Sequence, residues 1–201
     1  AVNGKDCVFY AIVLNPTGER SQALDAHKVI PATKVSEDDG AKARIYKKYI
    51  DTVLNENGTP TKITFKNEET FNFAFDVMDA IAEKDPNKVA MVHVSKDKTE
   101  RKFTFKDIKK ESNRVANYLK SLGIKKGDKV MLVLGRNYQF WFAMLGLNRI
   151  GAIGIPAMNQ LLDHDFEYRF NKADVRAIIC TAKGAVTEQV DIAAKKCPQL
   201  L

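Results

Sequence analysis

Polar side chains that follow two apolar runs are the strongest candidates for chemistry in this chain. Arg136 and Gln160 come just after short apolar stretches that begin at Lys129 and Ala152. Ligands of open α/β sheets bind outside the carboxyl ends of parallel strands, where both side chains are expected to lie. Loop capping and surface solvation remain the alternative interpretation of both. The position alone makes them functional candidates.

Asp163, His164 and Asp165 form the only cluster of carboxylates and histidine in the sequence. Adjacent residues on a helix point in different directions, so the three cannot share one metal ion. Favourable charge and capping at a helix N-terminus explain them more simply. The remaining reactive side chains lack the sequence context of a nucleophile or a ligand set: His27, His93, Ser112 and Cys180. We expect no catalytic residue and no metal site in this chain.

Signals for a bound phosphate are also missing. No G-x-G-x-x-G follows a strand, and no G-x-x-x-x-G-K-[ST] occurs. Gly151 and Gly154 in IGAIGIP come near the first pattern, but close packing of a strand against a helix is their simpler role. By itself the chain offers no cradle for a triphosphate.

Three short apolar runs must position these candidates. They begin at equal intervals, at Lys129, Ala152 and Val175, and helix-type segments fill the gaps. Strands joined by helical crossovers form parallel sheets with both faces covered. The segment from Tyr138 to Arg149 is apolar almost all round, which predicts burial on several sides. We therefore expect an α/β layered domain whose mainly parallel sheet (β-α-β-α-β from about 129 to 181) is flanked by helices.

The residues before this sheet predict a β-hairpin and amphipathic helices. VAMVHVS and RKFTF flank Lys96-Asp97-Lys98-Thr99 as the two strands of the hairpin. A further helix should begin at Thr104, with Asp107 in the capping-box position, and end at Gly123. Apolar spacing predicts helices over 41–54 and 72–84, and KITFK (62–66) is predicted to be an edge strand.

The first part of the chain follows a different pattern. Cys7 to Leu14 (CVFYAIVL) predicts a strand closed by a turn, so residues 1–18 could be the terminal strand of a preceding domain. The words VNGKDCVFYAIVLNPTG are similar to the closing strand of a cupin barrel. Residues 19–43 are polar and predict a linker. The domain with the parallel sheet is then expected over 44–201, truncated at its C-terminus.

Composition excludes several classes of protein. The net charge is +7, but Lys and Arg alternate with Asp and Glu and no basic run carries stacking aromatics, which argues against nucleic-acid binding. A positive surface also suits an anionic small ligand. No run of about 18 apolar residues exists, so we expect no membrane span. The three cysteines are far apart and show neither metal-ligand nor disulfide spacing, which favours a reducing, cytoplasmic setting.

The wording of residues 122–181 resembles a known family. LGIKKGDKV, a hydrophobic strand, GRNYQFWFAMLGLNRIGAIGIP, a polar helix and VRAIICT succeed one another as in the N-terminal subdomain of adenylate-forming (AMP-binding) acyl-CoA synthetases. GRNYQFWF is similar to the Arg-x-x-x-x-Trp stretch of the medium-chain group. FNFAFDVMDAIAEKDPNKVAMVHV and RKFTFKDIKKESNRVANYLKSLG match the opening of the family, so the resemblance runs from about Ile45 to Leu201.

The resemblance implies an activity for a longer enzyme. A carboxylic acid, such as a fatty acid, would react with ATP in the presence of Mg²⁺ to give an acyl adenylate and pyrophosphate, and the CoA thiolate would then displace AMP. The family's phosphate loop with its Lys, its adenine-binding motif and its catalytic Lys have no counterpart here. The chain is therefore expected to be an N-terminal fragment, inactive alone. The alternatives are a non-catalytic α/β binding or regulatory module and a different α/β enzyme.

Three residues take a role from the resemblance. Gln160 in AMNQ aligns with a Gln that contacts CoA in the medium-chain group. Lys183 and Gly184 lie where a related branch also touches CoA, although the arginines of that branch are replaced here by Ala, Val and Glu. The resemblance thus implies these three as CoA-binding residues, and it implies no binding of ATP or Mg²⁺ by this chain alone.

Overall fold

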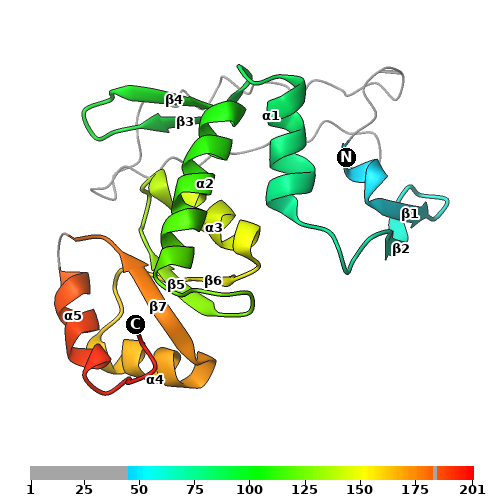
Figure 1. Ribbon diagram of the computed structural model, residues 1–201. Helices are drawn as coiled ribbons and strands as arrows, with labels where there is room; N and C mark the ends of the chain where they lie inside the picture. The colour runs from blue at the N-terminus through cyan, green and yellow to red at the C-terminus, as the bar shows by residue number, and fades with distance from the viewer. Residues whose placement is uncertain (1–44, 183–184) are drawn as a thin grey trace. The chain divides into compact units, whose positions relative to one another are not determined.

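The protein is represented by a computed structural model that describes residues 45–182 and 185–201 (Figure 1). The chain divides into two compact units, residues 1–71 and 72–201, which are described separately. The strand predicted at Cys7–Leu14 and the linker predicted at 19–43 lie outside the described residues, as do Lys183 and Gly184.

The first unit contains a β-hairpin where apolar spacing predicts a helix. After a 3-10 turn at Ile45–Lys48, β1 (Ile50–Leu54) pairs antiparallel with β2 (Pro60–Phe65). The prediction of a helix over 41–54 is therefore wrong over Ile50–Leu54, although Ile45–Lys48 is a short 3-10 helix, whereas the strand predicted at 62–66 is confirmed. β-Branched residues in IDTVL favour an extended backbone, and β2 supplies the partner that an isolated strand lacks.

The turn between these strands replaces the predicted end of a helix. Asn55 Oδ1 accepts hydrogen bonds from the backbone N–H groups of Asn57 (3.0 Å) and Thr59 (2.9 Å). The backbone N–H of Asn55 also donates to the carbonyl of Thr59 at 2.9 Å. An Asn side chain that accepts hydrogen bonds from the backbone of the next residues stabilises a turn. The residues predicted to end a helix therefore close a hairpin in the structure.

The second unit opens with the helices and hairpin that the sequence predicts. A helical segment combines a π-type stretch (Phe73–Asp79) with α1 (Ala80–Lys84), and it confirms the helix predicted over 72–84. β3 (Val89–Val94) pairs antiparallel with β4 (Glu100–Thr104), as expected for the hairpin. α2 (Phe105–Ser121) begins with the predicted capping box: Thr104 Oγ1 accepts from the Asp107 N–H, and Asp107 Oδ2 accepts from the Thr104 N–H.

The end of α2 shows why a glycine is needed at 123. The N–H of Ile124 donates to the Leu119 carbonyl (3.1 Å), and the N–H of Gly123 donates to the Lys120 carbonyl (3.0 Å). This pair of bonds is a Schellman motif, which requires a left-handed residue, and Gly123 has a φ of 87°. The predicted C-terminal cap is therefore confirmed.

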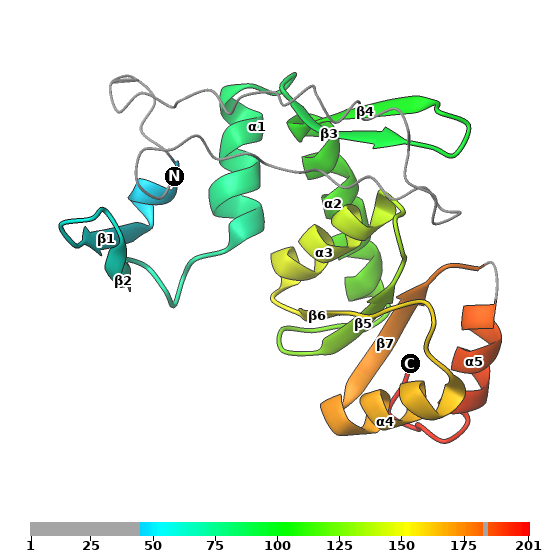
Figure 2. The ribbon, with the colours of Figure 1, turned by 180° about the vertical axis from the view of Figure 1, so that it is seen from behind.

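A three-stranded parallel sheet forms the centre of the second unit. β5 (Lys129–Val133) lies between β6 (Ile153–Pro156) and β7 (Val175–Cys180), in the order β6-β5-β7. α3 (Gln139–Ile150) connects β5 to β6, α4 (Asp163–Ala173) connects β6 to β7, and α5 (Ala185–Ala194) follows β7. Figures 1 and 2 show α2 and α3 on one face of the sheet and α4 and α5 on the other. The predicted α/β layered domain is confirmed.

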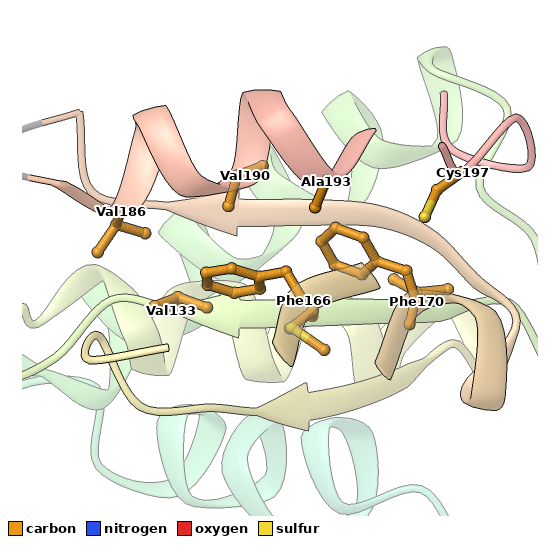
Figure 3. Close-up of a cluster of buried hydrophobic side chains, with 9 residues drawn as sticks. Val133, Phe166, Phe170, Val186, Val190, Ala193 and Cys197 are labelled. Carbon is orange, nitrogen blue, oxygen red and sulfur yellow. The ribbon is translucent and has the colours of Figure 1, made fainter. Parts of the chain in front are cut away.

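Alternation along β5 builds the two cores. Met131 and Val133 pack with the α4 and α5 side, whereas Val130, Leu132 and Leu134 pack with α2 and α3. Successive side chains of a strand point to opposite faces, so a short, wholly apolar strand serves both layers. Figure 3 shows the first of these cores, in which Phe166 and Phe170 of α4 gather with Val190 and Ala193 of α5 and with Val133 of β5.

α3 is buried over most of its surface, as its composition predicts. The helix buries Phe142, Ala143, Leu145, Gly146 and Leu147, although its Trp141 is 54% exposed. Gly154 on β6 lets this helix approach the sheet, since a Cβ there would lie 2.9 Å from Met144 Sδ. The packing role expected for Gly154 is confirmed. No helix within the described residues is both long and apolar enough to cross a membrane.

Candidate functional site

A pocket opens at the carboxyl ends of β5 and β6. Its volume is about 380 Å³, and its lining comes from the ends of the two strands, the loops after them and the first turn of α3. The lining residues are Leu132, Leu134, Gly135, Phe140, Pro156, Ala157, Met158, Asn159 and Gln160. This is the edge of the sheet where α/β domains bind ligands.

Hydrogen bonds beyond the ladder hold the ends of these strands in place. The N–H of Ala157 donates to the Leu132 carbonyl (2.9 Å), and the N–H of Thr181 donates to the Val133 carbonyl (3.2 Å). The three strands therefore stay in register to their last residues. Because their carboxyl ends are level, the chain leaves all three strands at one edge of the sheet.

The loop from β5 to α3 forms one wall of the pocket. Gly135 has a φ of 54°, a left-handed conformation that a residue with a Cβ rarely adopts. Asn137 closes the turn, because its backbone N–H (3.1 Å) and its side-chain amide both donate to the Leu134 carbonyl. The N–H of Phe140 then donates to the Asn137 carbonyl (3.1 Å), which carries the chain into α3.

The lining is mainly apolar, with two amides at its rim. Asn159 and Gln160 are exposed, and neither side chain makes a hydrogen bond to another described residue. Free amides beside an apolar floor can donate to and accept from a ligand, so they suit a molecule with an alkyl chain and peptide-like groups. No acid, base or nucleophile is among the lining residues.

The sequence candidates separate clearly in the structure. Gln160 lies in the pocket lining, as its position after β6 predicts, whereas Arg136 is exposed on the β5–α3 loop and does not line the pocket. Lys183 and Gly184 follow the carboxyl end of β7 in the sequence, but they lie outside the described residues. Phe140, Met158 and Asn159 line the pocket without having been predicted. Their nearness to a strand end could have indicated Met158 and Asn159; nothing local indicated Phe140.

The Asp163-His164-Asp165 cluster starts α4. The carboxylate of Asp165 accepts the Leu162 N–H (3.2 Å), and this bond, with the nearby His164 and Arg169, holds its pKa below the usual 3.8. The N–H of Asp163 donates to Gln189 Oε1 on α5 at 2.8 Å. No group of His, Cys, Asp and Glu within the described residues is arranged to hold a metal ion. The helix-start interpretation accounts for Asp163 and Asp165, whereas His164 is exposed and lies near both carboxylates.

The other reactive side chains have structural surroundings. Ser112 is fully buried and donates to the Lys109 carbonyl (3.1 Å) while it accepts from Arg149 Nε (2.9 Å). Burial, with the nearby Asp191, raises the pKa of the Cys180 thiol, so that it is a poor nucleophile. His93 packs edge-on against the Tyr138 ring, with the centroids 5.2 Å apart. None of the three lines the pocket.

Comparisons with known proteins now identify the class to which this layered fold and pocket belong. The model of the AMP-binding enzyme family matches residues 78–200. The chain belongs to this family. The match includes every element from α1 to α5 and every residue that lines the pocket.

The more particular likeness is to acyl-CoA synthetases. The chain is 36% identical to the mitochondrial acyl-coenzyme A synthetase ACSM5 of Rattus norvegicus over 138 residues, which cover 66% of this chain and 24% of the relative. It is 34% identical to the acetyl-coenzyme A synthetase of Bacillus subtilis (strain 168) over 112 residues, 55% of this chain and 19% of the relative. The family resemblance expected from the sequence is confirmed. The chain spans about a quarter of the length of the rat relative.

Solved structures agree on the fold. The acyl-CoA synthetase of Brucella canis matches with a TM-score of 0.58 and 28% identity, over 65% of this chain and 23% of that one. The anthranilate CoA ligase AuaEII, solved in complex with anthranoyl-AMP, matches with a TM-score of 0.57 and 25% identity, over 65% of this chain and 24% of that one. The fold of the second unit is thus one that acyl-CoA-forming enzymes share.

Proposed function

We propose that this chain is a segment of an ATP-dependent acyl-CoA synthetase, and that its pocket forms a wall of the cleft that binds CoA. The observation that carries the proposal is the combination of the family match with an apolar pocket whose rim holds the free amide of Gln160. The relatives are named for the synthesis of acyl-coenzyme A, and the substrate classes of this chain are inferred from that likeness. The preceding terminal strand at 1–18, the linker at 19–43 and the domain over 44–201 remain proposals of the same kind.

The proposed reaction has two steps. A carboxylate oxygen of the acid attacks the α-phosphorus of ATP, the bond to the β-phosphate oxygen breaks, and pyrophosphate leaves with its electron pair. The CoA thiolate then attacks the acyl carbon, and AMP leaves as the thioester forms. Both steps need donors and cations near the phosphates, with Mg²⁺ proposed among them. The chain has no phosphate-binding motif, so we assign those roles to other parts of the enzyme.

This chain would act in the second step by binding and orientation. The apolar floor of the pocket can hold an alkyl segment, and the amides of Asn159 and Gln160 can bind the peptide-like groups of the CoA arm. Lys183 and Gly184, which follow the carboxyl end of β7 in the sequence, are proposed to contact CoA as well. Orientation of the thiol at the acyl carbon raises the rate without a reactive side chain from this segment.

The compartment remains a proposal. Cys180 and Cys197 are free thiols, which fits the reducing cytoplasm expected from the cysteine pattern. The rat relative is named as mitochondrial, and the mitochondrial matrix is also reducing. Fractionation of cells that express the native protein tests the cytoplasmic assignment.

The first experiment titrates the isotope-labelled chain with CoA and follows the amide signals by NMR. Signals from Gly135 and the Gln160 side chain are expected to shift, and Q160A is expected to weaken binding about fivefold, the loss of one hydrogen bond. Q139A is the matched control, because Gln139 is also exposed but does not line the pocket. Unchanged affinity in Q160A would contradict the assignment of Gln160.

A second experiment separates the two reaction steps. In a protein that joins this chain to the remainder of such an enzyme, Q160A is expected to raise the KM for CoA and to leave ATP–pyrophosphate exchange unchanged, since exchange needs no CoA. The chain alone is expected to release no pyrophosphate above background when given ATP and a panel of fatty acids. Acid-dependent release by the chain alone would overturn the division of roles.

A further inference from the structure

Tyr138 connects the pocket wall to the β3–β4 hairpin. It lies at the end of the β5–α3 loop, two residues before Phe140, which lines the pocket. Its hydroxyl accepts a hydrogen bond from Arg101 Nη1 on β4 at 2.6 Å, and the Arg101 guanidinium lies 5.1 Å from the centre of its ring. One side chain thus receives both a hydrogen bond and a cation–π contact from the hairpin.

Aromatic contacts hold the same ring from two further sides. The centroid of Tyr138 is 4.9 Å from that of Phe103 on β4 and 5.6 Å from that of Phe142 on α3. Phe103 and Phe142 also meet edge-to-face at 5.4 Å. Together with the edge-on contact from His93, these rings place Tyr138 in a cage whose walls belong to β3, β4 and α3.

Tyr138 also marks the start of α3. Tyr138 occupies the N-cap position, where Ser, Thr, Asp and Asn are preferred, and it makes no side-chain capping bond. The N–H of Trp141 donates to the Tyr138 carbonyl (3.1 Å), so the first turn of the helix begins from this residue. A side chain that cannot cap the helix is instead fixed by the hairpin.

We infer that Tyr138 is a positioning residue for the pocket: the β3–β4 hairpin, through Arg101 and Phe103, holds Tyr138, and Tyr138 holds the wall from Gly135 to Phe140. The hairpin itself does not line the pocket. It acts by limiting the movement of the first turn of α3, and therefore of the Phe140 ring that the ligand meets. This inference rests on the proposed function for the identity of the ligand, CoA, but not for the mechanical connection.

Trp141 offers a direct measurement of that connection. It is the single tryptophan of the chain, it is half-exposed, and its ring meets the Phe140 ring edge-on at 5.3 Å. Loosening of the first turn of α3 should raise its accessibility to a quencher. We expect acrylamide to quench Trp141 about twice as efficiently in Y138A as in the unchanged chain, because a side chain released from its packing samples more rotamers.

The test compares Y138A, Y138F and R101A with the control Y118A, since Tyr118 is 64% exposed on α2 and does not line the pocket. Y138A is expected to weaken CoA binding about fivefold or more, Y138F and R101A about threefold, the range of one hydrogen bond. Y138F keeps the ring packing and so should rescue most of the quenching change. The double variant Y138F/R101A should cost no more than R101A alone, because R101A already removes the hydrogen bond that Y138F removes.

A structural role without positioning has a different signature. It would lower the midpoint of urea unfolding in Y138A and leave both CoA affinity and Trp141 quenching as in Y118A, and this result overturns the inference. If the unchanged chain does not bind CoA at all, the proposed role of the pocket fails. The acrylamide quenching of Trp141 then decides by itself whether Tyr138 positions the pocket wall from Gly135 to Phe140. Y138F and R101A are expected to keep the fold, because both leave the packing of the ring at 138 against Phe103 and Phe142 in place, and they make the test independent of the stability of Y138A.

Discussion

Arg149 and Asp79 form a bidentate ion pair across 70 residues of sequence, with Nη1–Oδ2 and Nη2–Oδ1 distances of 2.9 and 2.6 Å. Arg149 lies on α3, and its side chain is only 3% exposed. Its Nε donates to Ser112 on α2, and its guanidinium lies 5.1 Å from the centre of the Phe75 ring. One cation therefore holds together the helical segment 73–84, α2 and α3, and the first turn of α3 lines the pocket.

Removal of one partner should be costly because the other charge stays buried. D79A is expected to lower the free energy of unfolding by about 3–5 kcal/mol, as measured by urea denaturation followed by circular dichroism. E83A is the matched control: Glu83 is 72% exposed and paired with Lys109, so its loss should cost no more than about 1 kcal/mol. Equal losses in the two variants would show that the pair does not stabilise this layer.

Gly146 lets α2 and α3 pack against each other. A Cβ at this position would lie 2.8 Å from Val115 Cγ1 and 3.2 Å from the backbone nitrogen of Ala116. Alanine gains about 1 kcal/mol of helix propensity over glycine, but a β-branched side chain and a backbone atom cannot move away. G146A should therefore destabilise the protein by about 1–3 kcal/mol.

The cause of that loss can be checked with a second substitution. V115A removes the nearer obstacle, so the double variant G146A/V115A should lose less stability than the sum of the two single variants. G154A is the comparison on β6, where the atoms met are the flexible end of Met144 and the cost should be smaller. Additive losses would contradict a steric origin.

The capping box of α2 should make stability depend on acid. Hydrogen bonds from the backbone and hydroxyl of Thr104 hold the pKa of Asp107 below its usual 3.8 in the folded protein. A carboxylate whose pKa is lower when folded adds stability above its unfolded pKa, and this contribution is lost as pH falls through the folded pKa. Below about pH 4 the unchanged protein should therefore lose this contribution to its stability. D107N has no such contribution at any pH.

Urea unfolding at a series of pH values measures this contribution. At neutral pH, D107N is expected to be less stable by about 1 kcal/mol, the value of a helix N-terminal cap. The gap should close at strongly acidic pH. E100Q, at an exposed position of β4, serves as the control and should keep the full acid dependence. A gap that stays constant with pH would rule out the titration of Asp107 as its cause.

Phe170 packs on the face of the sheet that α4 and α5 cover. Its side chain is fully buried and stacks with Phe166 at 5.7 Å. F170A should lower the free energy of unfolding by about 3–5 kcal/mol, through lost transfer energy and the cavity left behind. Y168A, two residues away at 64% exposure, should change it by about 0.5 kcal/mol at most. Calorimetric or urea midpoints compare the two directly.

Some features of the candidate site could be predicted because they are local. The position of Gln160 after a strand, the capping box at Thr104 and the glycine at 123 each depend on a few neighbouring residues. The apolar run at β5 also predicts its own burial. Phe140 and Tyr138 could not be assigned in this way, because their roles depend on loops and strands that are distant in sequence.

The segment from Ile50 to Leu54 shows the limit of such local patterns. Its apolar spacing fits one face of a helix, yet the segment forms β1, because Pro60–Phe65 pairs with it antiparallel, in regular register as far as Val53. A short sequence that fits two structures is decided by the partner it meets. The pattern of the segment alone holds no information about that partner.

The sequence by itself determined the layered α/β class, the order of helices and strands after residue 72, and the edge of the sheet where Gln160 lies. Each results from periodicity or turn chemistry, which act over a few residues. Only the tertiary structure decided which side chains meet: the Arg149–Asp79 pair, the Tyr138 cage and the wall of the pocket. Such contacts depend on how whole helices and strands pack, and packing is settled by surfaces that become neighbours only when the chain has folded.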